Sequence, residues 1–241
     1  MSKLSLSFAG AGLALLAIAG VAAPRAAPAT TPGASVMASE LHNAAAKNDV
    51  VAVRKLLAAG APVDARNAAG ATPLLVATHA NSIAAAEALI AAGADVNAKD
   101  NIQDSPYLYA GARGLSGILK LTLAHGADLR SVNRFGGTAL IPAAERGHVE
   151  TVRLLIGAGV AVDHVNRLGW TALLEAIILS DGGPAHQQIV RLLVDAGANV
   201  NLADHDGVTP LAHARRRGYH AIAQILTAAG ARNPGQNHDR Y

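Results

Sequence analysis

The chain has 241 residues, of which 15% are charged, and its formal net charge at pH 7 is +3. So small an excess of positive charge gives no support to nucleic-acid binding. Because the sequence contains no cysteine, disulfide bonds, thiol catalysis, thiolate metal sites and a cysteine-linked lipid anchor are excluded.

Residues 1–23 have the organisation of a secretory signal peptide. A single basic residue, Lys3, precedes an apolar stretch, and small residues follow up to Ala23. We therefore predict a periplasmic or secreted protein, cleaved near Ala22 or Ala23, with residues 27–29 as a second candidate for the cleavage site. The alternative is an uncleaved anchor in the inner membrane, since residues 4–23 are uncharged and about long enough to span a bilayer. Residues 24–38 are rich in Ala, Pro and Thr, which predicts a disordered linker.

Beyond the linker, two short phrases recur at a fixed interval. The first is a glycine after an apolar run, and its successive spacings are 33, 33, 33, 38 and 33 residues. The glycines are Gly60, Gly93, Gly126, Gly159, Gly197 and Gly230. The second is Thr-Pro-Leu or Thr-Ala-Leu, which begins at Thr72, Thr138, Thr171 and Thr209, with the variant Ser-Pro-Tyr at Ser105. A period of this length is typical of a stacked repeat protein.

The unit that begins at residue 133 shows the expected local structure most clearly. Thr138 is a helix N-cap, and the first helix runs to about Arg146, where Gly147 interrupts it. Apolar residues at helical spacing predict a second helix over residues 149–158. Gly159 ends that helix, because a glycine readily takes a positive φ. Each unit is therefore predicted to be a pair of helices followed by an extended turn.

These phrases resemble those of ankyrin repeats. Residues 93–97, Gly-Ala-Asp-Val-Asn, reproduce a family phrase verbatim, and residues 197–201 nearly do. The resemblance covers residues 39–233 and implies an all-α repeat solenoid of six stacked helix-turn-helix units with β-turn fingers. The expected units are residues 39–66, which lack the leading turn, and 67–99, 100–132, 133–165, 166–203 and 204–233; residues 234–241 are expected to form a flexible tail.

The resemblance also implies a function. Fingers and first helices line a concave groove in this family, and the groove is the usual binding surface. We therefore interpret the chain as a monomeric, non-catalytic module that binds another protein of the periplasm or envelope, with no cofactor, nucleic acid or, after signal cleavage, membrane. No phosphate loop or Gly-x-Ser-x-Gly elbow occurs in the sequence. The ten histidines are scattered without the spacing of a zinc site, so no metal is expected.

The third unit departs most from the repeat. It has Gln103 where four other units have a turn glycine, which indicates either a strained turn or a different one. Tyr107 and Tyr109 stand where the family prefers leucine or similar residues. With Asp104 they place polar groups near the groove. The alternative is that both rings fill core positions and that their hydroxyls bond to the backbone.

Two aromatic residues in the finger turns, Phe135 and Trp170, are candidates for exposed binding anchors. The alternative is that each ring packs on the neighbouring finger.

Charged residues of the first helices are expected to border the groove; they are Arg113, Glu145, Arg146, Glu175, His213 and Arg216. Glu175 and His213 occupy equivalent positions in adjacent units, where they could form an ion pair. The cluster could receive a charged side chain of the partner, or it could tie the units together. With Tyr109, the same two residues suggest an alternative function, a pocket for a small polar ligand or for catalysis. A third possibility is a membrane-tethered spacer, if the N-terminus is not cleaved.

The fifth unit contains five extra residues, 38 minus 33, which we place near residues 179–183. We expect them to lengthen the first helix and its turn, with Asp181 in a contact loop, although neutral drift would leave the same pattern. His186 aligns with His148 under this placement. The predicted partner-binding residues are thus Asp104, Tyr109, Arg113, Phe135, Glu145, Arg146, Trp170, Glu175, Asp181 and His213.

Overall fold

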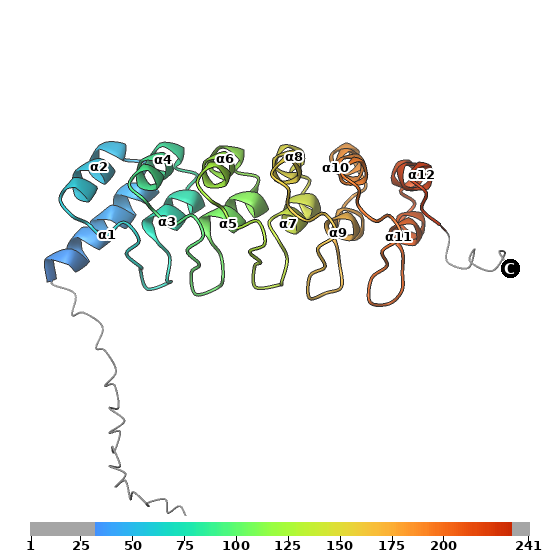
Figure 1. Ribbon diagram of the computed structural model, residues 1–241, viewed down its shortest axis with the longest axis horizontal. Helices are drawn as coiled ribbons and strands as arrows, with labels where there is room; N and C mark the ends of the chain where they lie inside the picture. Colours follow the sequence, from blue (N-terminus) through green and yellow to red (C-terminus); the bar gives the residue numbers. More distant parts are fainter. Residues whose placement is uncertain (1–31, 233–241) are drawn as a thin grey trace, which may run out of the picture. The chain divides into compact units, whose positions relative to one another are not determined.

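The computed structural model describes residues 32–232, which belong to one compact unit. In this range the chain forms twelve helices and no strand, arranged as six consecutive helix-turn-helix pairs (Figure 1). The prediction of an all-α solenoid of six units is therefore confirmed. The predicted signal peptide, residues 1–23, and the predicted tail, residues 234–241, lie outside the described residues.

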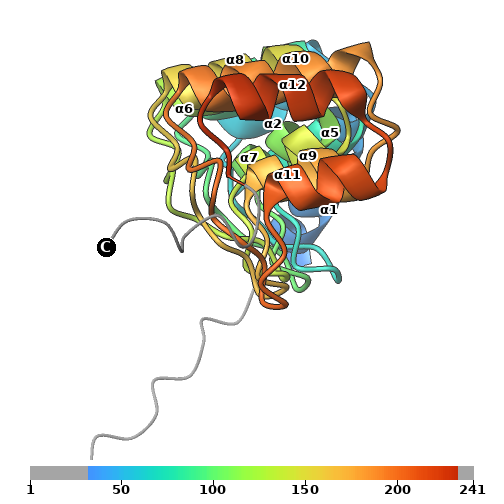
Figure 2. The same ribbon diagram turned by 90° about the vertical axis from the view of Figure 1, so that its right-hand side faces the viewer.

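The helices form two layers. The first helices of the pairs are α1 (Pro32–Ala46), α3 (Pro73–His79), α5 (Pro106–Arg113), α7 (Leu140–Glu145), α9 (Ala172–Ile178) and α11 (Pro210–Arg216). The second helices are α2 (Val50–Ala58), α4 (Ile83–Ala91), α6 (Ser116–Ala124), α8 (Val149–Gly157), α10 (Pro184–Asp195) and α12 (His220–Ala228). Each helix contacts its counterpart in the next unit. The finger loops that precede α3, α5, α7, α9 and α11 all project from the same edge of the stack (Figures 1 and 2).

The recurring hydroxyl residue of the second phrase begins the first helix, as the sequence predicts. The side chains of Thr72, Ser105, Thr171 and Thr209 each accept a hydrogen bond from the backbone N–H three residues later, at 3.2 to 3.3 Å. Such a cap satisfies one of the free N–H groups of the first turn. Thr138 is the exception, because its buried hydroxyl has no partner within residues 32–232.

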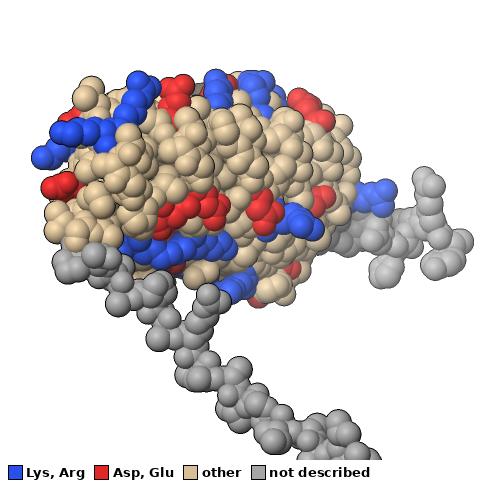
Figure 3. All heavy atoms as spheres, turned by 60° about the vertical axis from the view of Figure 1, so that its left-hand side comes forward, with Lys and Arg blue, Asp and Glu red and all other residues tan. Residues whose placement is uncertain are grey.

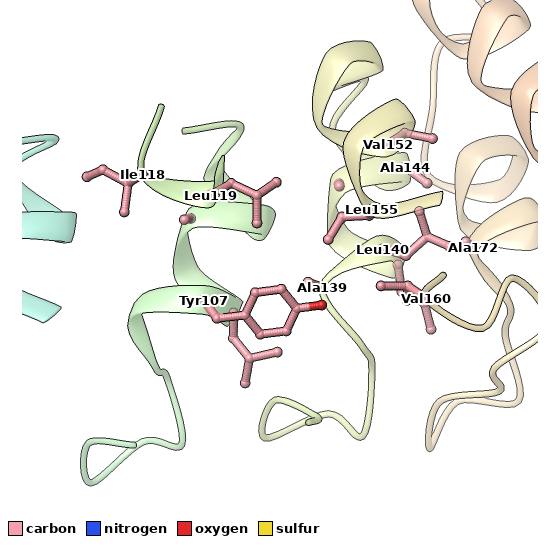
Figure 4. Close-up of a cluster of buried hydrophobic side chains, with 14 of the residues drawn as sticks. Tyr107, Ile118, Leu119, Ala139, Leu140, Ala144, Val152, Leu155, Val160 and Ala172 are labelled. Atoms are coloured by element: carbon pink, nitrogen blue, oxygen red, sulfur yellow. The ribbon is translucent and has the colours of Figure 1, made fainter. Parts of the chain in front are cut away.

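The core lies between the two helix layers and continues from unit to unit. Leu119 and Leu155 from the second helices belong to the same buried cluster as Leu140 from a first helix (Figure 4). Tyr107 is fully buried in this cluster, and its phenol oxygen points toward Ala139 (Figure 4). The interpretation of Tyr107 as a core residue is therefore correct. The expected backbone partner is missing, since the Tyr107 hydroxyl has no hydrogen bond within the described residues.

Two boundaries differ from the sequence-based expectation. Helix α1 begins at Pro32, so residues 32–38 are helical and the predicted linker is wrong for that part. Proline suits the first position of a helix, and Met37 packs against the core. In the fifth unit, α9 has seven residues, like α3 and α11, whereas α10 has twelve and α8 has nine. The extra residues therefore lengthen the second helix and the loop before it, because Pro184 begins α10 early.

The insertion leaves the register of the histidines intact. The rings of His148 and His186 lie over Gly114 and Gly147, the glycines that follow α5 and α7. The two histidines thus occupy equivalent places in consecutive units, as their alignment predicts.

The turn at Gln103 is the same turn as in the other fingers. Its N–H donates to the carbonyl of Asp100 at 3.1 Å, as Gly70 does to Asn67 at 2.8 Å. Gln103 has a φ of 69°, in the region that favours glycine. The strained alternative is therefore the correct one.

No helix within residues 32–232 has the length and hydrophobicity needed to cross a membrane.

Candidate functional site

A pocket of about 350 Å³ opens in the groove of the third, fourth and fifth units. Side chains of α5, α7 and α9 and of the fingers before these three helices line it. It thus lies between the first helices and the finger turns, where the resemblance places the binding groove. Seven of the ten predicted site residues line it: Asp104, Tyr109, Arg113, Phe135, Glu145, Arg146 and Glu175.

The other three predicted residues are not part of this pocket lining. Trp170 is half-buried, and both its backbone N–H and its carbonyl bond to Asn166, at 3.0 Å each. Asp181 is exposed in the loop before α10, where its carboxylate accepts from the N–H of Gly183 at 2.8 Å and lies 3.1 Å from His186. His213 lies on α11, one unit beyond the pocket.

The expected ion pair between Glu175 and His213 is wrong. Asn166 Nδ2 donates to Glu175 Oε1 at 2.7 Å, and His213 Nε2 donates to Asp204 Oδ2 at 2.7 Å. Each first-helix residue therefore bonds to the residue nine positions earlier, at the base of its own finger. That partner lies within the same unit, whereas Glu175 and His213 are one repeat apart. In the alternative hypothesis, Tyr109, Glu175 and His213 form one pocket. Tyr109 and Glu175 do line a common pocket, but His213 does not.

Glu175 is the most deeply buried charged group of the pocket, with 5% of its surface exposed. Burial, and after it the charge of Glu145, raises the pKa of Glu175 to about 7; the hydrogen bond from Asn166 and the charge of Arg146 act in the opposite direction. The carboxyl group therefore changes its charge near neutral pH, inside the groove.

A second carboxyl group lines the same pocket at the base of the finger before α5. Burial, together with the charge of Asp100, raises the pKa of Asp104, while Arg134 lowers it. Nη1 of Arg134 lies 3.9 Å from Oδ2 of Asp104, and its guanidinium lies 4.8 Å from the centre of the Phe135 ring. Arg134 therefore links the fourth finger to the third through its charge, and it contacts Phe135 of its own finger through a cation–π interaction.

Tyr109 is half-buried, and its ring forms part of the pocket lining. Its centre lies 4.3 Å from that of His79, with the planes tilted by 60°, and the guanidinium of Arg113 lies 5.9 Å away. Arg146 donates to the carbonyl of Ala112 at 2.6 Å. Contacts between neighbouring units thus hold the ring and the arginine at the pocket edge.

Three consecutive finger tips each expose a large apolar side chain. Ile102, Phe135 and Leu168 have 54%, 54% and 53% of their surface exposed. Of these three residues, only Phe135 is predicted from the sequence, although successive members lie 33 positions apart. The repeat register is the signal that could have found Ile102 and Leu168. Leu179, at the end of α9, is 49% exposed and lines the pocket together with Phe135 and Leu168.

Charges of both signs are mixed on the surface. On the face drawn in Figure 3, acidic side chains lie in a row beside basic ones. Within residues 32–232, no group of three or more His, Asp or Glu side chains is placed to hold a metal ion.

The family model for ankyrin repeats (three copies) matches residues 36–100 and 107–204, which is more than half of the chain. The chain belongs to the ankyrin repeat family. Ankyrin repeats are generally protein–protein interaction modules, and the family is typically not enzymatic.

Solved structures of the family are similar over most of this ankyrin repeat chain. An ankyrin repeat domain from Acinetobacter baumannii AYE is 66% identical, with a TM-score of 0.78, over 80% of this chain and 98% of that one. The ankyrin repeat protein EF0377 is 44% identical, with a TM-score of 0.76, over 79% and 97% of the two chains. The ankyrin repeat domain of Bcl-3, a member of the IkappaB family, is 29% identical, with a TM-score of 0.73, over 80% and 86%.

A curated relative, the ankyrin repeat protein YahD of Escherichia coli (strain K12), is 57% identical over 58 residues. The match covers 24% of this chain and 29% of YahD, so it spans less than a third of the relative's length.

Proposed function

We propose that this ankyrin repeat chain binds a partner protein of the periplasm or cell envelope, without catalysis, through the pocket and finger tips of its third to fifth units. The observation that carries the proposal is the meeting of two features at one place. The pocket lies in these units, and their finger tips expose Ile102, Phe135 and Leu168. Exposed large apolar side chains close to a polar cavity are typical of interaction sites.

The finger geometry suits recognition because the scaffold is already ordered. Arg167 donates from its backbone N–H to the carbonyl of Phe135 at 3.0 Å and from Nη1 to the carbonyl of Arg134 at 2.8 Å. These bonds link the fourth finger to the fifth and restrict the position of Phe135. A partner that docks here therefore loses little free energy in ordering the surface.

The compartment in the proposal rests on residues 1–23. Fractionation of the expressed full chain, with mass spectrometry of its N-terminus, tests it. A shortened chain in the periplasmic fraction is expected. A full-length chain in the membrane fraction would support the tethered spacer instead.

Affinity capture from a cell-envelope extract tests the proposed surface. The test variant is Phe135→Asp/Leu168→Asp, since both residues line the pocket. The matched control is Val36→Asp/Val51→Asp, which changes two exposed apolar residues of the first unit. We expect a protein captured by the wild type and the control to be lost from the test variant, provided that circular dichroism shows all three to be folded. Equal capture by all three chains would contradict the assignment of the surface.

A further inference from the structure

We propose that the pocket receives a cationic side chain of the partner, a lysine or an arginine, whose charge lies against the carboxylates of Glu145 and Glu175. The inference rests on the proposed protein-binding function and adds the chemistry of the central contact.

Two carboxyl groups of the pocket, those of Glu145 and Glu175, form no salt bridge with the described residues 32–232. Glu145 lies on α7 and Glu175 on α9, which pack against each other, and the charge of Glu145 acts on Glu175. Oε1 of Glu175 accepts from the neutral amide of Asn166, and the Glu145 carboxylate has no hydrogen bond in this part of the chain. Their mutual repulsion is therefore only partly offset, by Arg146.

The arginines of the pocket are engaged at its edge. Arg113 lies over the ring of Tyr109, Arg134 over that of Phe135, and Arg146 donates to a backbone carbonyl. All three are exposed, so water screens their charge. Glu175 is buried and Glu145 half-buried, and an added charge interacts more strongly where water is excluded. The electrostatic interaction free energy is therefore more favourable for a cation bound by the carboxylates than for an anion bound by the arginines.

The apolar part of the pocket suits the rest of such a side chain. Phe135, Leu168 and Leu179 line the pocket together with Glu145 and Glu175. Lysine and arginine have aliphatic stems that pack on apolar surface while the charged group reaches a polar partner. An apolar neighbour in the partner's sequence would contact the finger tips. The structure therefore points to a basic residue flanked by apolar ones.

Three short peptides test the charge preference directly. The probe is acetyl-Leu-Arg-Leu-amide, titrated at about pH 8.5 into the isotopically labelled full chain and followed by NMR. Acetyl-Leu-citrulline-Leu-amide has nearly the same shape without the charge, and acetyl-Leu-Glu-Leu-amide reverses it. We expect the arginine peptide to bind at least about tenfold more tightly than the citrulline peptide, as for a charge-assisted contact.

Two variants assign that difference to the carboxylates. Glu145→Gln/Glu175→Gln should bind the arginine and citrulline peptides equally. Glu87→Gln/Glu150→Gln changes two exposed carboxylates of the second helices and should keep the wild-type preference. Phe135→Ala should weaken both peptides without changing their ratio.

The preference should also depend on pH. Affinity for the arginine peptide should fall between about pH 8.5 and about pH 5.5, because Glu175 takes up a proton in this range, and the affinity for the citrulline peptide should stay constant. The other charged groups around Glu175 are Glu145 at the end of α7, Arg146 just after it, and the Asp204–His213 pair of the next unit. Asp104, Arg113 and Arg134 also line the pocket. In the Glu145→Gln/Glu175→Gln variant only these other groups can titrate, so any pH dependence that remains in the variant comes from them.

The proposal is overturned if the citrulline or glutamate peptide binds as tightly as the arginine peptide, or if the arginine peptide does not bind at millimolar concentrations. Neither result bears on the affinity capture described above, which tests the protein-binding surface whatever the charge of its partner.

Discussion

Tyr107 combines complete burial with an unsatisfied polar atom. Its ring is fully inside the core, and its hydroxyl has no hydrogen bond within the described residues. A buried hydroxyl without a partner destabilises the folded state, because water satisfies it in the unfolded chain. We therefore expect Tyr107→Phe to raise the free energy of unfolding by about 1 kcal/mol, as measured by urea titration.

The matched control for this substitution is Tyr109→Phe, two residues away on the same helix. Tyr109 is half-buried at the pocket, so the loss of its hydroxyl should change the free energy of unfolding by less than about 0.5 kcal/mol. A loss of stability in Tyr107→Phe would mean that its hydroxyl has a partner, such as a buried water.

Gln103 carries backbone strain that the other fingers avoid. Its φ of 69° is the conformation that glycine adopts at Gly70, Gly136, Gly169 and Gly207. A side chain in this region costs about 1–2 kcal/mol. Gln103→Gly should therefore raise the free energy of unfolding by about 0.5–1 kcal/mol in the same titration, since the added flexibility of the unfolded chain offsets part of the gain. Gln103→Ala keeps the Cβ atom and should show no gain; if glycine destabilises the chain, the glutamine side chain makes contacts that outweigh the strain.

At the scale of the helices, the repeat made most of the structure predictable. Capping residues and helix-ending glycines are local signals, so the helix ends of later units follow from the sequence. The start of α1 at Pro32 does not, because its first turns contain proline, glycine and serine, which are typical of a linker. The extra residues of the fifth unit are equally ambiguous. An alignment on Gly197 gives the number of extra residues. It does not show whether they lengthen α9 or α10.

The second helix of the fourth unit offers a direct test of core placement. Leu155 is fully buried on α8. Leu155→Ala removes three carbon atoms from the core and should cost about 2–5 kcal/mol in the free energy of unfolding. Leu179→Ala makes the same change at a half-exposed position beyond α9 and should cost less than about 1 kcal/mol. Similar losses in the two variants would contradict the different burial of the two leucines.

At the scale of the whole stack, side-chain pairing was harder to predict than the fold. The repeat register correctly placed Glu175 and His213 in equivalent positions, and it suggested a bond along the row of first helices. In the structure both bond to the base of their own finger instead, at Asn166 and Asp204. The repeat period shows which residues occupy equivalent positions in neighbouring units. It does not give the distances that decide whether a side chain bonds to the next unit or to its own finger. The half-burial of Trp170 also depends on how neighbouring fingers pack.

The stability of the whole chain should depend on pH through Glu175. Its pKa is raised from an ordinary value of 4.5 to about 7 in the folded state. The folded chain therefore holds a proton that the unfolded chain releases between these two values. The stabilisation from this difference is complete below about pH 4.5 and is lost as the pH rises through 7.

Glu175→Gln should remove this loss, because the amide cannot ionise and its oxygen can still accept from Asn166. The variant should be more stable than the wild type at about pH 8, by on the order of 3 kcal/mol, and should match it near pH 4.5. Urea titrations of both proteins at several pH values measure the difference. The raised pKa of Asp104 also makes the folded state less stable as the pH rises. Burial lowers the pKa values of His79 and His148, which makes the folded state more stable as the pH rises. These groups are present in both proteins, so their contributions largely cancel in the difference. Parallel curves would mean that the Glu175 carboxyl group is solvated in the folded protein, and that the pocket does not hold a buried charge.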